Sequence, residues 1–198
     1  LLSLAEHFAA PGARPKRSLM FLWTVGAEEG LLGSAWFTEH PTVPRGRMVA
    51  SINIDMIGRG GARDGAEGGP EYLRIVGARR LSSAFGAWIE EVNRRAEFGF
   101  HLDGEVDSSA GDVQTYCSGD QWNFARWGIP SALITTGKHA DYHTVRDEIE
   151  RIDYPKYAHV TRFIAALVTD LASRPVRPSI GKVKPDPRAL CITAPDSR

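Results

Sequence analysis

The amino-acid sequence predicts an α/β fold in which strands and helices alternate and pack in layers. Short apolar runs of strand length alternate along the chain with segments that carry a helical pattern of apolar residues. Glycine, proline and polar stretches separate these segments. With 198 residues the chain has room for one domain, to which we assign residues 1–173. Residues 174–198 are rich in proline and basic residues and are predicted to be a tail or linker.

The predicted elements follow one another in order along the chain. Four short runs are predicted to be strands: residues 18–25, 48–56, 72–76 and 131–136. The first two are almost wholly apolar, which is typical of strands buried on both faces. Five segments are predicted to be helices: residues 1–10, 31–40, 81–98, 120–127 and 154–172. Pro41 ends the second helix and Gly128 the fourth, while residues 99–118 are polar and predicted to be irregular.

The composition argues against several classes of protein. Lys and Arg together number 24, as do Asp and Glu, so the chain lacks the basic excess of nucleic-acid-binding proteins. It has no apolar run long enough to span a membrane. Residues 58–69 are glycine-rich but lack the motifs that bind nucleotides, so a surface loop is predicted there. Cys117 and Cys191 cannot form a CxxC zinc site, and the sequence leaves open whether they pair.

Three short polar motifs follow predicted strands directly. GAEEG at residues 26–30 follows the first strand, Asp55 closes the second, and HADYH at residues 139–143 follows the fourth. In α/β folds, ligands bind beyond the carboxyl ends of the strands. The sequence therefore predicts that these motifs meet at one site.

Taken singly, each of these motifs also has a structural explanation. Glu28 and Glu29 fit a solvated turn, and Asp55 near a buried strand needs a cation, hydrogen-bond donors or a metal as its partner. His143 alone fits a surface loop. Together, carboxylates and an imidazole from different strand ends suit a catalytic zinc ion that keeps one position open for water. A neighbouring carboxylate that is not a ligand can then move protons.

Several separated blocks resemble the zinc aminopeptidases of the aminopeptidase Y and aminopeptidase S type. The blocks are AEEGLLGS, NIDMIG and DYHTVRD, in this order, and GDQWNFARWGIPSALITTG resembles a further stretch of that family. The resemblance runs from about residue 17 to residue 171. It implies a three-layer α/β/α fold with a central mixed, mostly parallel sheet and an extracytoplasmic location. It also implies hydrolysis of the peptide bond next to a free amino terminus.

The resemblance implies a role for each matching residue. Glu28 would be the general base that takes a proton from the attacking water. Glu29 and His143 would be ligands of one zinc ion, and Asp55 would be a ligand of a second. Tyr142 would donate a hydrogen bond to the oxyanion of the tetrahedral intermediate.

The sequence departs from the family pattern in the block before the fourth strand. A Ser-Asp-His triplet of the family is replaced by Gly119-Asp120-Gln121. We expect this replacement to alter the substrate pocket rather than zinc binding. Asp120, Gln121, Trp122 and His139 are the residues predicted to line that pocket.

A second departure concerns the ligand set. The family has an upstream histidine ligand and an aspartate that bridges the two zinc ions, and both precede the helix that residues 1–10 resemble. We therefore expect this chain alone to bind zinc weakly and not to be a competent peptidase. A missing N-terminal segment, or a partner chain, would complete the site.

The same fold carries alternative functions. Glutaminyl cyclases share these blocks but bind one zinc ion, and carboxypeptidases also occur on the fold. Non-catalytic ectodomains that bind partners usually lose the ligands. The joint presence of Glu28, Glu29, Asp55, Tyr142 and His143 argues against that last class.

Overall fold

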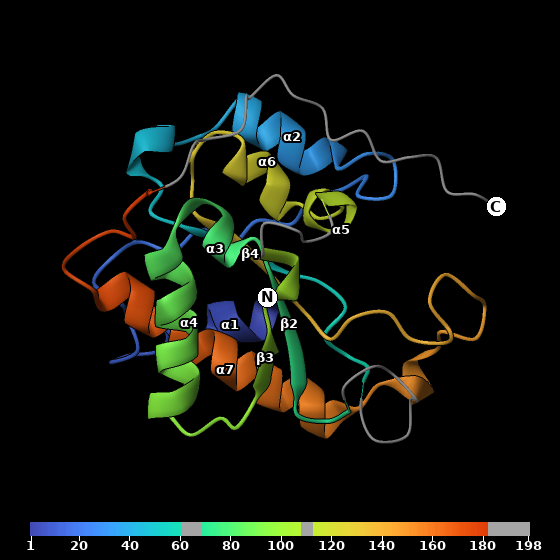
Figure 1. The fold of residues 1–198 in the computed structure, drawn as a ribbon. Coiled ribbons are helices and arrows are strands. Elements are labelled where there is room, and N and C mark those ends of the chain that lie inside the picture. The colour runs from blue at the N-terminus through green and yellow to red at the C-terminus, as the bar shows by residue number, and fades with distance from the viewer. Residues whose placement is uncertain (61–68, 108–112, 182–198) are drawn as a thin grey trace.

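A computed structural model describes residues 1–60, 69–107 and 113–181 of the chain. The helices and strands in these ranges are α1 (Leu2–Ala9), α2 (Leu32–Glu39), β1 (Ser51–Ile54), β2 (Tyr72–Val76), α3 (Ala78–Leu81), α4 (Ser83–Arg95), β3 (His101–Asp103), α5 (Val113–Cys117), α6 (Gln121–Ala125), β4 (Ser131–Thr135) and α7 (Tyr154–Ser173) (Figure 1). Short 3₁₀ turns are η1 (Arg45–Arg47), η2 (Glu105–Asp107) and η3 (Ile149–Arg151). None of the described helices is both long and apolar enough to cross a membrane.

The sheet has four strands in the order β1-β4-β2-β3. β1 pairs in parallel with β4, with Ile54 opposite Ile134, and β2 pairs in parallel with β3. The central β2–β4 pair is antiparallel. The predicted mixed, mostly parallel sheet is confirmed.

Helices cover both faces of the sheet, which confirms the predicted three layers. On one face α4 and α7 bury a core against β2 and β4, and its fully buried members include Leu73, Phe85, Ile134 and Phe163. On the other face α3, α5 and α6 bury a second core around Val76 and Leu133. Figure 1 shows α2, α5 and α6 on one side of the sheet, with α1 and α7 on the other.

Local side-chain chemistry explains where the two long helices begin. The Asp153 carboxylate accepts a hydrogen bond from the Lys156 N–H at 3.0 Å and caps α7. The Ser82 hydroxyl caps α4 in the same way through the Phe85 N–H at 3.1 Å. The boundaries of both helices therefore follow from sequence signals near their first turns.

The predicted strand at residues 18–25 is wrong. The segment is extended but forms no ladder, and no backbone hydrogen bond joins it to β1 in the described part of the chain. Leu19 and Phe21 pack against the core, while Trp23 and Val25 are 59% and 76% exposed. A strand exists only where a neighbour accepts and donates its backbone hydrogen bonds, and apolar composition alone does not supply that neighbour.

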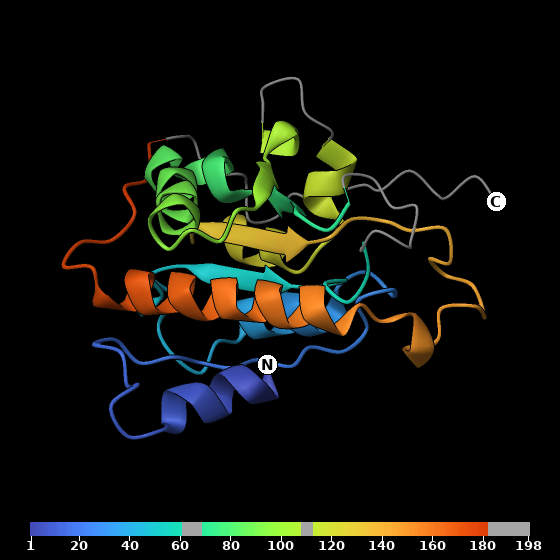
Figure 2. The ribbon, with the colours of Figure 1, turned by 90° about the horizontal axis from the view of Figure 1, so that it is seen from below.

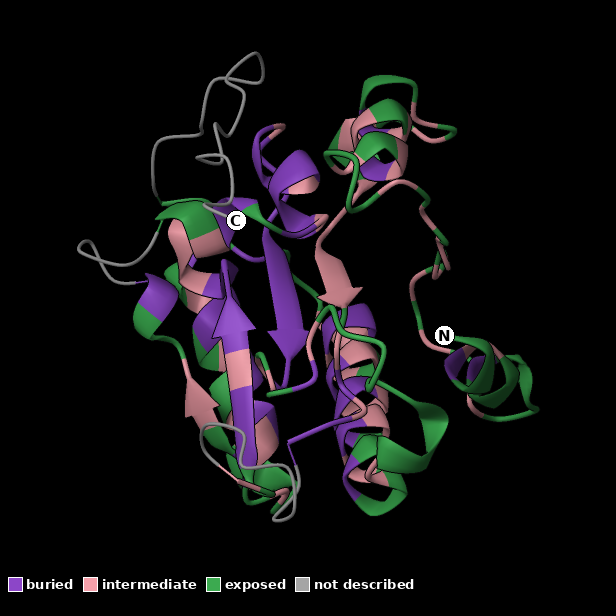
Figure 3. Ribbon diagram, turned by 90° about the vertical axis from the view of Figure 1, so that its right-hand side faces the viewer, coloured by how far each residue is buried: buried purple, intermediate pink, exposed green. Residues whose placement is uncertain are grey.

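β1 is also less buried than predicted. All four of its residues are of intermediate exposure, whereas all five residues of β4 are buried. Figure 3 shows this contrast, and Figure 2 shows β1 at the margin of the sheet on the side of α1. The cause is position, because β1 lies at the edge of the sheet formed by the described residues and pairs there with β4.

The predicted irregular region at residues 99–118 contains β3, η2 and α5. β3 is three residues long and polar at both ends, so no period of two can be read from it. Its pairing with β2, with Leu102 opposite Leu73, makes it a strand.

The first residues of the predicted tail lie on the domain. Arg174 forms ion pairs with Glu91 at 2.6 Å and with Asp170, and the Gly181 N–H donates to the Leu81 carbonyl at 3.1 Å. The rest of the predicted tail, with Cys191, lies outside the described residues. Cys117 is buried and disulfide-bonded.

Phe163 is the residue whose truncation should destabilise the fold most clearly. Its ring is fully buried and makes edge contacts with Phe98 and Phe100, with centroids at 5.4 and 5.5 Å. We expect Phe163→Ala to lower the free energy of unfolding by about 3–5 kcal/mol, because the site loses a large apolar group and keeps a cavity. Tyr157→Ala, on the exposed side of the same helix, should cost about 0.5 kcal/mol. Urea unfolding followed by circular dichroism measures both, and equal losses would contradict this account of the core.

Candidate metal centre

A cavity of about 2300 Å³ opens at the carboxyl ends of β1 and β4. Its polar lining at that end comes from Glu28, Asp55, Asp120, Tyr142 and His143. The cavity also runs along the gap between residues 18–24 and β1, where α7 contributes Ile164 and Val168. The predicted site and the edge of β1 that faces residues 18–24 therefore line the same cavity.

The loop that carries Glu28 is held by a close approach of α2 to the extended segment. The Gly33 N–H donates to the Val25 carbonyl at 2.9 Å. A Cβ at position 33 would lie 2.6 Å from the Val25 nitrogen, so only glycine fits there. Leu31, at the helix N-cap, has a positive φ of 60°. The GLLG sequence thus explains the sharp turn that brings Glu28 to the cavity.

Asp120 anchors this loop from α6. Its carboxylate accepts a hydrogen bond from the Thr24 hydroxyl at 2.7 Å and a second from the Ser34 hydroxyl. The Asn123 amide donates to the same Ser34 oxygen at 2.8 Å. Asp120 therefore fixes the two segments that flank Glu28.

Gln121 lies behind the cavity wall. It is fully buried, its oxygen accepts from the Asn53 amide at 3.3 Å, and its nitrogen donates to the Tyr116 carbonyl at 2.9 Å. The sequence predicts Gln121 in the substrate pocket, whereas the cavity lining does not include it. Its amide instead links β1 to α5 through the core.

Asp55 sits at the turn that ends β1. The next residue, Met56, has a positive φ of 53°, and its carbonyl accepts from the Thr136 N–H at 3.0 Å. Desolvation by the surrounding protein atoms raises the pKa of Asp55, and the charges of Asp120 and Glu28 raise it further against the hydrogen bond from Met56. Three carboxylates thus face one space, and a cation there would relieve their repulsion.

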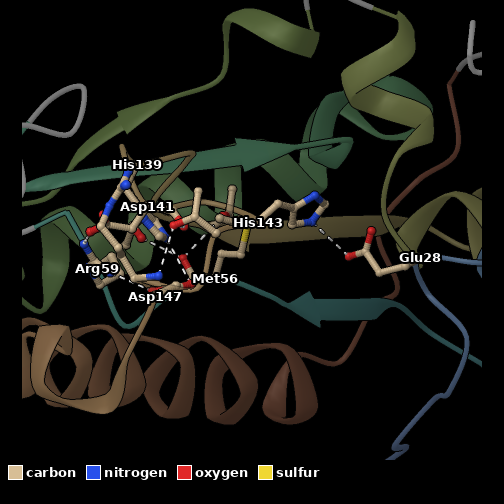
Figure 4. A network of polar contacts seen from close by, with 11 residues as sticks. Glu28, Met56, Arg59, His139, Asp141, His143 and Asp147 are labelled. Atoms are coloured by element: carbon tan, nitrogen blue, oxygen red, sulfur yellow. Dashed lines mark hydrogen bonds and ion pairs between the residues drawn. The ribbon is translucent and has the colours of Figure 1, made fainter. Parts of the chain in front are cut away.

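His143 reaches this space from the loop after β4. Its Nε2 lies 3.5 Å from Glu28 Oε1, and both side chains are largely exposed (Figure 4). The imidazole stacks on the Tyr142 ring with centroids 3.8 Å apart, and the Lys138 ammonium lies 5.1 Å from that ring. The φ of His143 is 58°, a conformation that needs support from the loop around it.

The other predicted site residues divide between the cavity and the surface. Trp122 lines the cavity and packs edge-on against Tyr116 at 5.5 Å. His139 also lines it, with its Nε2 3.7 Å from Asp147. Glu29 is exposed on the turn and is not part of the cavity lining.

The donor chemistry of this site fits zinc, although the ligand set is small. Carboxylate oxygens and an imidazole nitrogen are the ligand types that zinc takes in hydrolases. Within the described residues, no three His, Cys, Asp or Glu side chains are grouped closely enough to hold a metal ion. The donor types present therefore suit zinc, but the described residues do not form a complete metal-binding group.

A sequence profile of peptidase family M28 matches residues 1–168. The chain belongs to peptidase family M28. No curated protein matches it.

Solved structures similar to this M28 chain share its fold. BSAP, a zinc aminopeptidase from Bacillus subtilis, is 20% identical, with a TM-score of 0.57 over 75% of this chain and 34% of that chain. The LapA aminopeptidase of Legionella pneumophila is 20% identical, with a TM-score of 0.57 over 77% and 39%. An aminopeptidase from Aneurinibacillus sp. strain AM-1 is 20% identical, with a TM-score of 0.55 over 80% and 34%. The M28 chain thus spans between a third and two fifths of the length of these proteins.

Sequence reasoning missed the residues that hold the site in place. Thr24 and Ser34 orient Asp120, and Arg59 binds two carboxylates beside His143. Thr24 and Ser34 are common residue types in unremarkable positions, and Arg59 lies in a glycine-rich stretch. The one available signal was that Arg59 follows Asp55 by four residues.

Asp55→Asn should change how the stability of the metal-free protein depends on pH. The pKa of Asp55 is raised in the folded state, so the fold binds its proton more tightly than the unfolded chain does. This contribution is complete below the unfolded pKa of about 4 and is lost as pH rises through the folded pKa. With a chelator present, we expect the variant to unfold at a higher temperature than wild type at about pH 7 and to approach wild type towards about pH 4.

Glu148→Gln, which removes an exposed carboxylate from the same region, is the matched control. Thermal unfolding of the three proteins across this pH range measures the effect. A difference between the Asp55 variant and wild type that stays constant with pH would show that the pKa of Asp55 is not raised.

Proposed function

We propose that this chain is part of the catalytic domain of a zinc aminopeptidase, an exopeptidase that removes residues from the amino end of peptides. The observation that carries the proposal is the convergence of Glu28, Asp55 and His143 from three separate segments at one end of the sheet. Membership of peptidase family M28 supports it, as do the aminopeptidases among the similar structures.

Each residue at the site would have a separate role in the reaction. Asp55 and His143 would hold zinc, together with Glu29, which is exposed on the turn beside Glu28. When bound, zinc polarises the scissile carbonyl and acidifies the attacking water. The Glu28 carboxylate would accept the proton of that water and return it to the leaving amine. The Tyr142 hydroxyl would donate a hydrogen bond to the carbonyl oxygen as it gains negative charge.

We further infer that the site is completed by a β-strand lying between residues 18–25 and β1. Both flanking segments are extended, and no described backbone group pairs across the gap between them. The gap belongs to the cavity, and side chains of α7, α2 and α6 line it. A strand there would gain a ladder on each side, with each hydrogen bond contributing about 0.5–1.5 kcal/mol.

The position of this strand suits the ligands that the family resemblance places upstream. Glu28 and Asp55 follow the two flanking segments at the same end. The carboxyl end of a strand parallel to β1 would therefore reach both residues, where one aspartate could bridge two zinc ions. The similar aminopeptidases are about two and a half to three times as long as their matched parts, which leaves room for such a segment.

Glu28→Gln tests the assignment of the base. In the full-length protein that contains this chain, we expect kcat for leucine p-nitroanilide to fall by about 10²–10⁴-fold, because the amide cannot accept the proton. Zinc content measured by atomic emission should not change. Full activity in the variant would remove Glu28 as the base. Wild-type protein that binds one zinc ion and lacks peptidase activity would favour a glutaminyl cyclase, and one with neither zinc nor hydrolysis would favour a partner-binding domain.

The inserted strand is tested by comparing the 198-residue chain with the full-length protein. We expect two zinc ions per chain and hydrolysis only in the full-length protein. Amide hydrogens of residues 18–24 and of the outer edge of β1 should exchange more slowly there, because they gain ladder partners. Equal exchange at residues 18–24 in both proteins would refute the strand, and tight stoichiometric zinc binding by the 198-residue chain would refute the incomplete site.

A further inference from the structure

Arg59 joins the segment after β1 to the loop that carries His143. Its Nη1 lies 2.6 Å from Asp147 Oδ1, and its Nη2 lies 2.7 Å from Asp141 Oδ2 (Figure 4). The side chains of Arg59 and Asp141 are only 8% and 12% exposed. One guanidinium thus binds two carboxylates that lie 82 and 88 residues away in the sequence.

The two carboxylates bracket Tyr142 and His143 on the loop of residues 137–148, which we call the histidine loop. Asp141 immediately precedes this pair, and Asp147 follows it by four residues. Within the loop, the Thr144 N–H donates to the Asp141 carbonyl at 3.0 Å, and the Asp147 N–H donates to the Thr144 carbonyl at 3.2 Å. The part of the loop between Asp141 and Asp147 is therefore a compact turn, and Arg59 binds the aspartate at each end of that turn.

The contacts of Arg59 help to explain the backbone conformation of His143. A φ of 58° is unfavourable for a residue other than glycine and persists where surrounding contacts enforce it. The segment that carries Arg59 is also held in place. The Met56 carbonyl accepts a hydrogen bond from the Thr136 N–H, and the Gly58 carbonyl accepts one from the Asp153 N–H at 2.8 Å. Arg59 thus projects from a segment bound to both β4 and the start of α7.

The charges around Arg59 explain why this contact suits an arginine. The Asp141 carboxylate also forms an ion pair with the Arg146 Nε at 3.1 Å, on the solvent side. Two arginines therefore contact two aspartates. The planar guanidinium offers parallel N–H groups to two acceptors, whereas a lysine ammonium is a single point charge. The pairing occupies both aspartates of the histidine loop, whereas the His143 imidazole faces Glu28 across the cavity at 3.5 Å.

We propose that Arg59 is a positioning residue that sets the place of His143 and Tyr142 relative to Asp55. The proposal rests on the proposed function for its consequence in catalysis. Arg59 does not line the cavity, and it would act by tying the histidine loop to the segment that follows Asp55. Residues that orient metal ligands in this way commonly change affinity or activity by about 10–100-fold when replaced.

The test uses the full-length protein with Arg59→Gln, Arg59→Lys and the double variant Arg59→Gln/Asp147→Asn. Arg95→Gln is the matched control, because Arg95 forms a 2.9 Å ion pair with Asp170 between α4 and α7, outside the cavity lining. We expect Arg59→Gln to lower kcat by about 10–100-fold, with KM changed by less than about threefold. Arg59→Lys should restore part of the loss, and Arg95→Gln should retain wild-type kcat.

The double variant separates positioning from folding stability. It removes the charge of Asp147, which loses its arginine partner in Arg59→Gln, so part of any loss in thermal stability should be recovered. If Arg59 positions the histidine loop, kcat should stay low in the double variant. Recovery of kcat together with stability, or unchanged kcat in Arg59→Gln, would overturn the proposal.

Amide hydrogen exchange gives a measurement that does not depend on activity. The N–H groups of Tyr142, Thr144 and Asp147 are hydrogen-bonded within the histidine loop. They should exchange faster in Arg59→Gln and at the wild-type rate in Arg95→Gln. Wild-type protein without peptidase activity would refute the proposed function alone, while unchanged exchange in Arg59→Gln would refute the attachment by Arg59.

Discussion

β1 and β4 are paired in parallel with Ile54 opposite Ile134, and the position of the site depends on this register. The register places Asp55 beside the end of β4 and lets the Met56 carbonyl accept from Thr136. Because both strands end at the same edge, the segments that follow them run side by side. A shift of one residue would move Asp55 to the opposite face and separate it from the loop that carries His143.

Two charged side chains hold the loops that carry Glu28 and His143. Asp120 binds the hydroxyls of Thr24 and Ser34 on either side of Glu28, and Arg59 binds the carboxylates on either side of His143. Glu28 and His143 are themselves exposed. The residues proposed for chemistry are therefore accessible, while the groups that hold them are partly or largely buried. This arrangement suits a site that must receive a metal and a peptide without losing its geometry.

The unpaired edge of β1 shows how strongly backbone hydrogen bonding limits a sheet. Residues 18–25 are largely apolar, yet they form no ladder with any strand in the described ranges. Apolar packing holds Leu19 and Phe21 against the core and leaves a cavity between the segment and β1. The same cavity reaches the carboxylates of Glu28 and Asp55. The gap beside β1 and the proposed metal site therefore belong to the same cavity.

The sequence by itself determined the fold class, the helices with apolar faces, and three of the polar residues that line the cavity, Glu28, Asp55 and His143. These features depend on local periodicity, turn chemistry and strand ends, which can be read over a few residues. Only the tertiary structure decided that residues 18–25 pair with no strand among the described residues, that β3 is a strand and that Gln121 lies in the core. It also revealed the contact of Arg59 with Asp141 and Asp147. Each of these depends on groups far apart in the sequence, because a hydrogen bond or ion pair is defined by its partner and local composition does not name that partner.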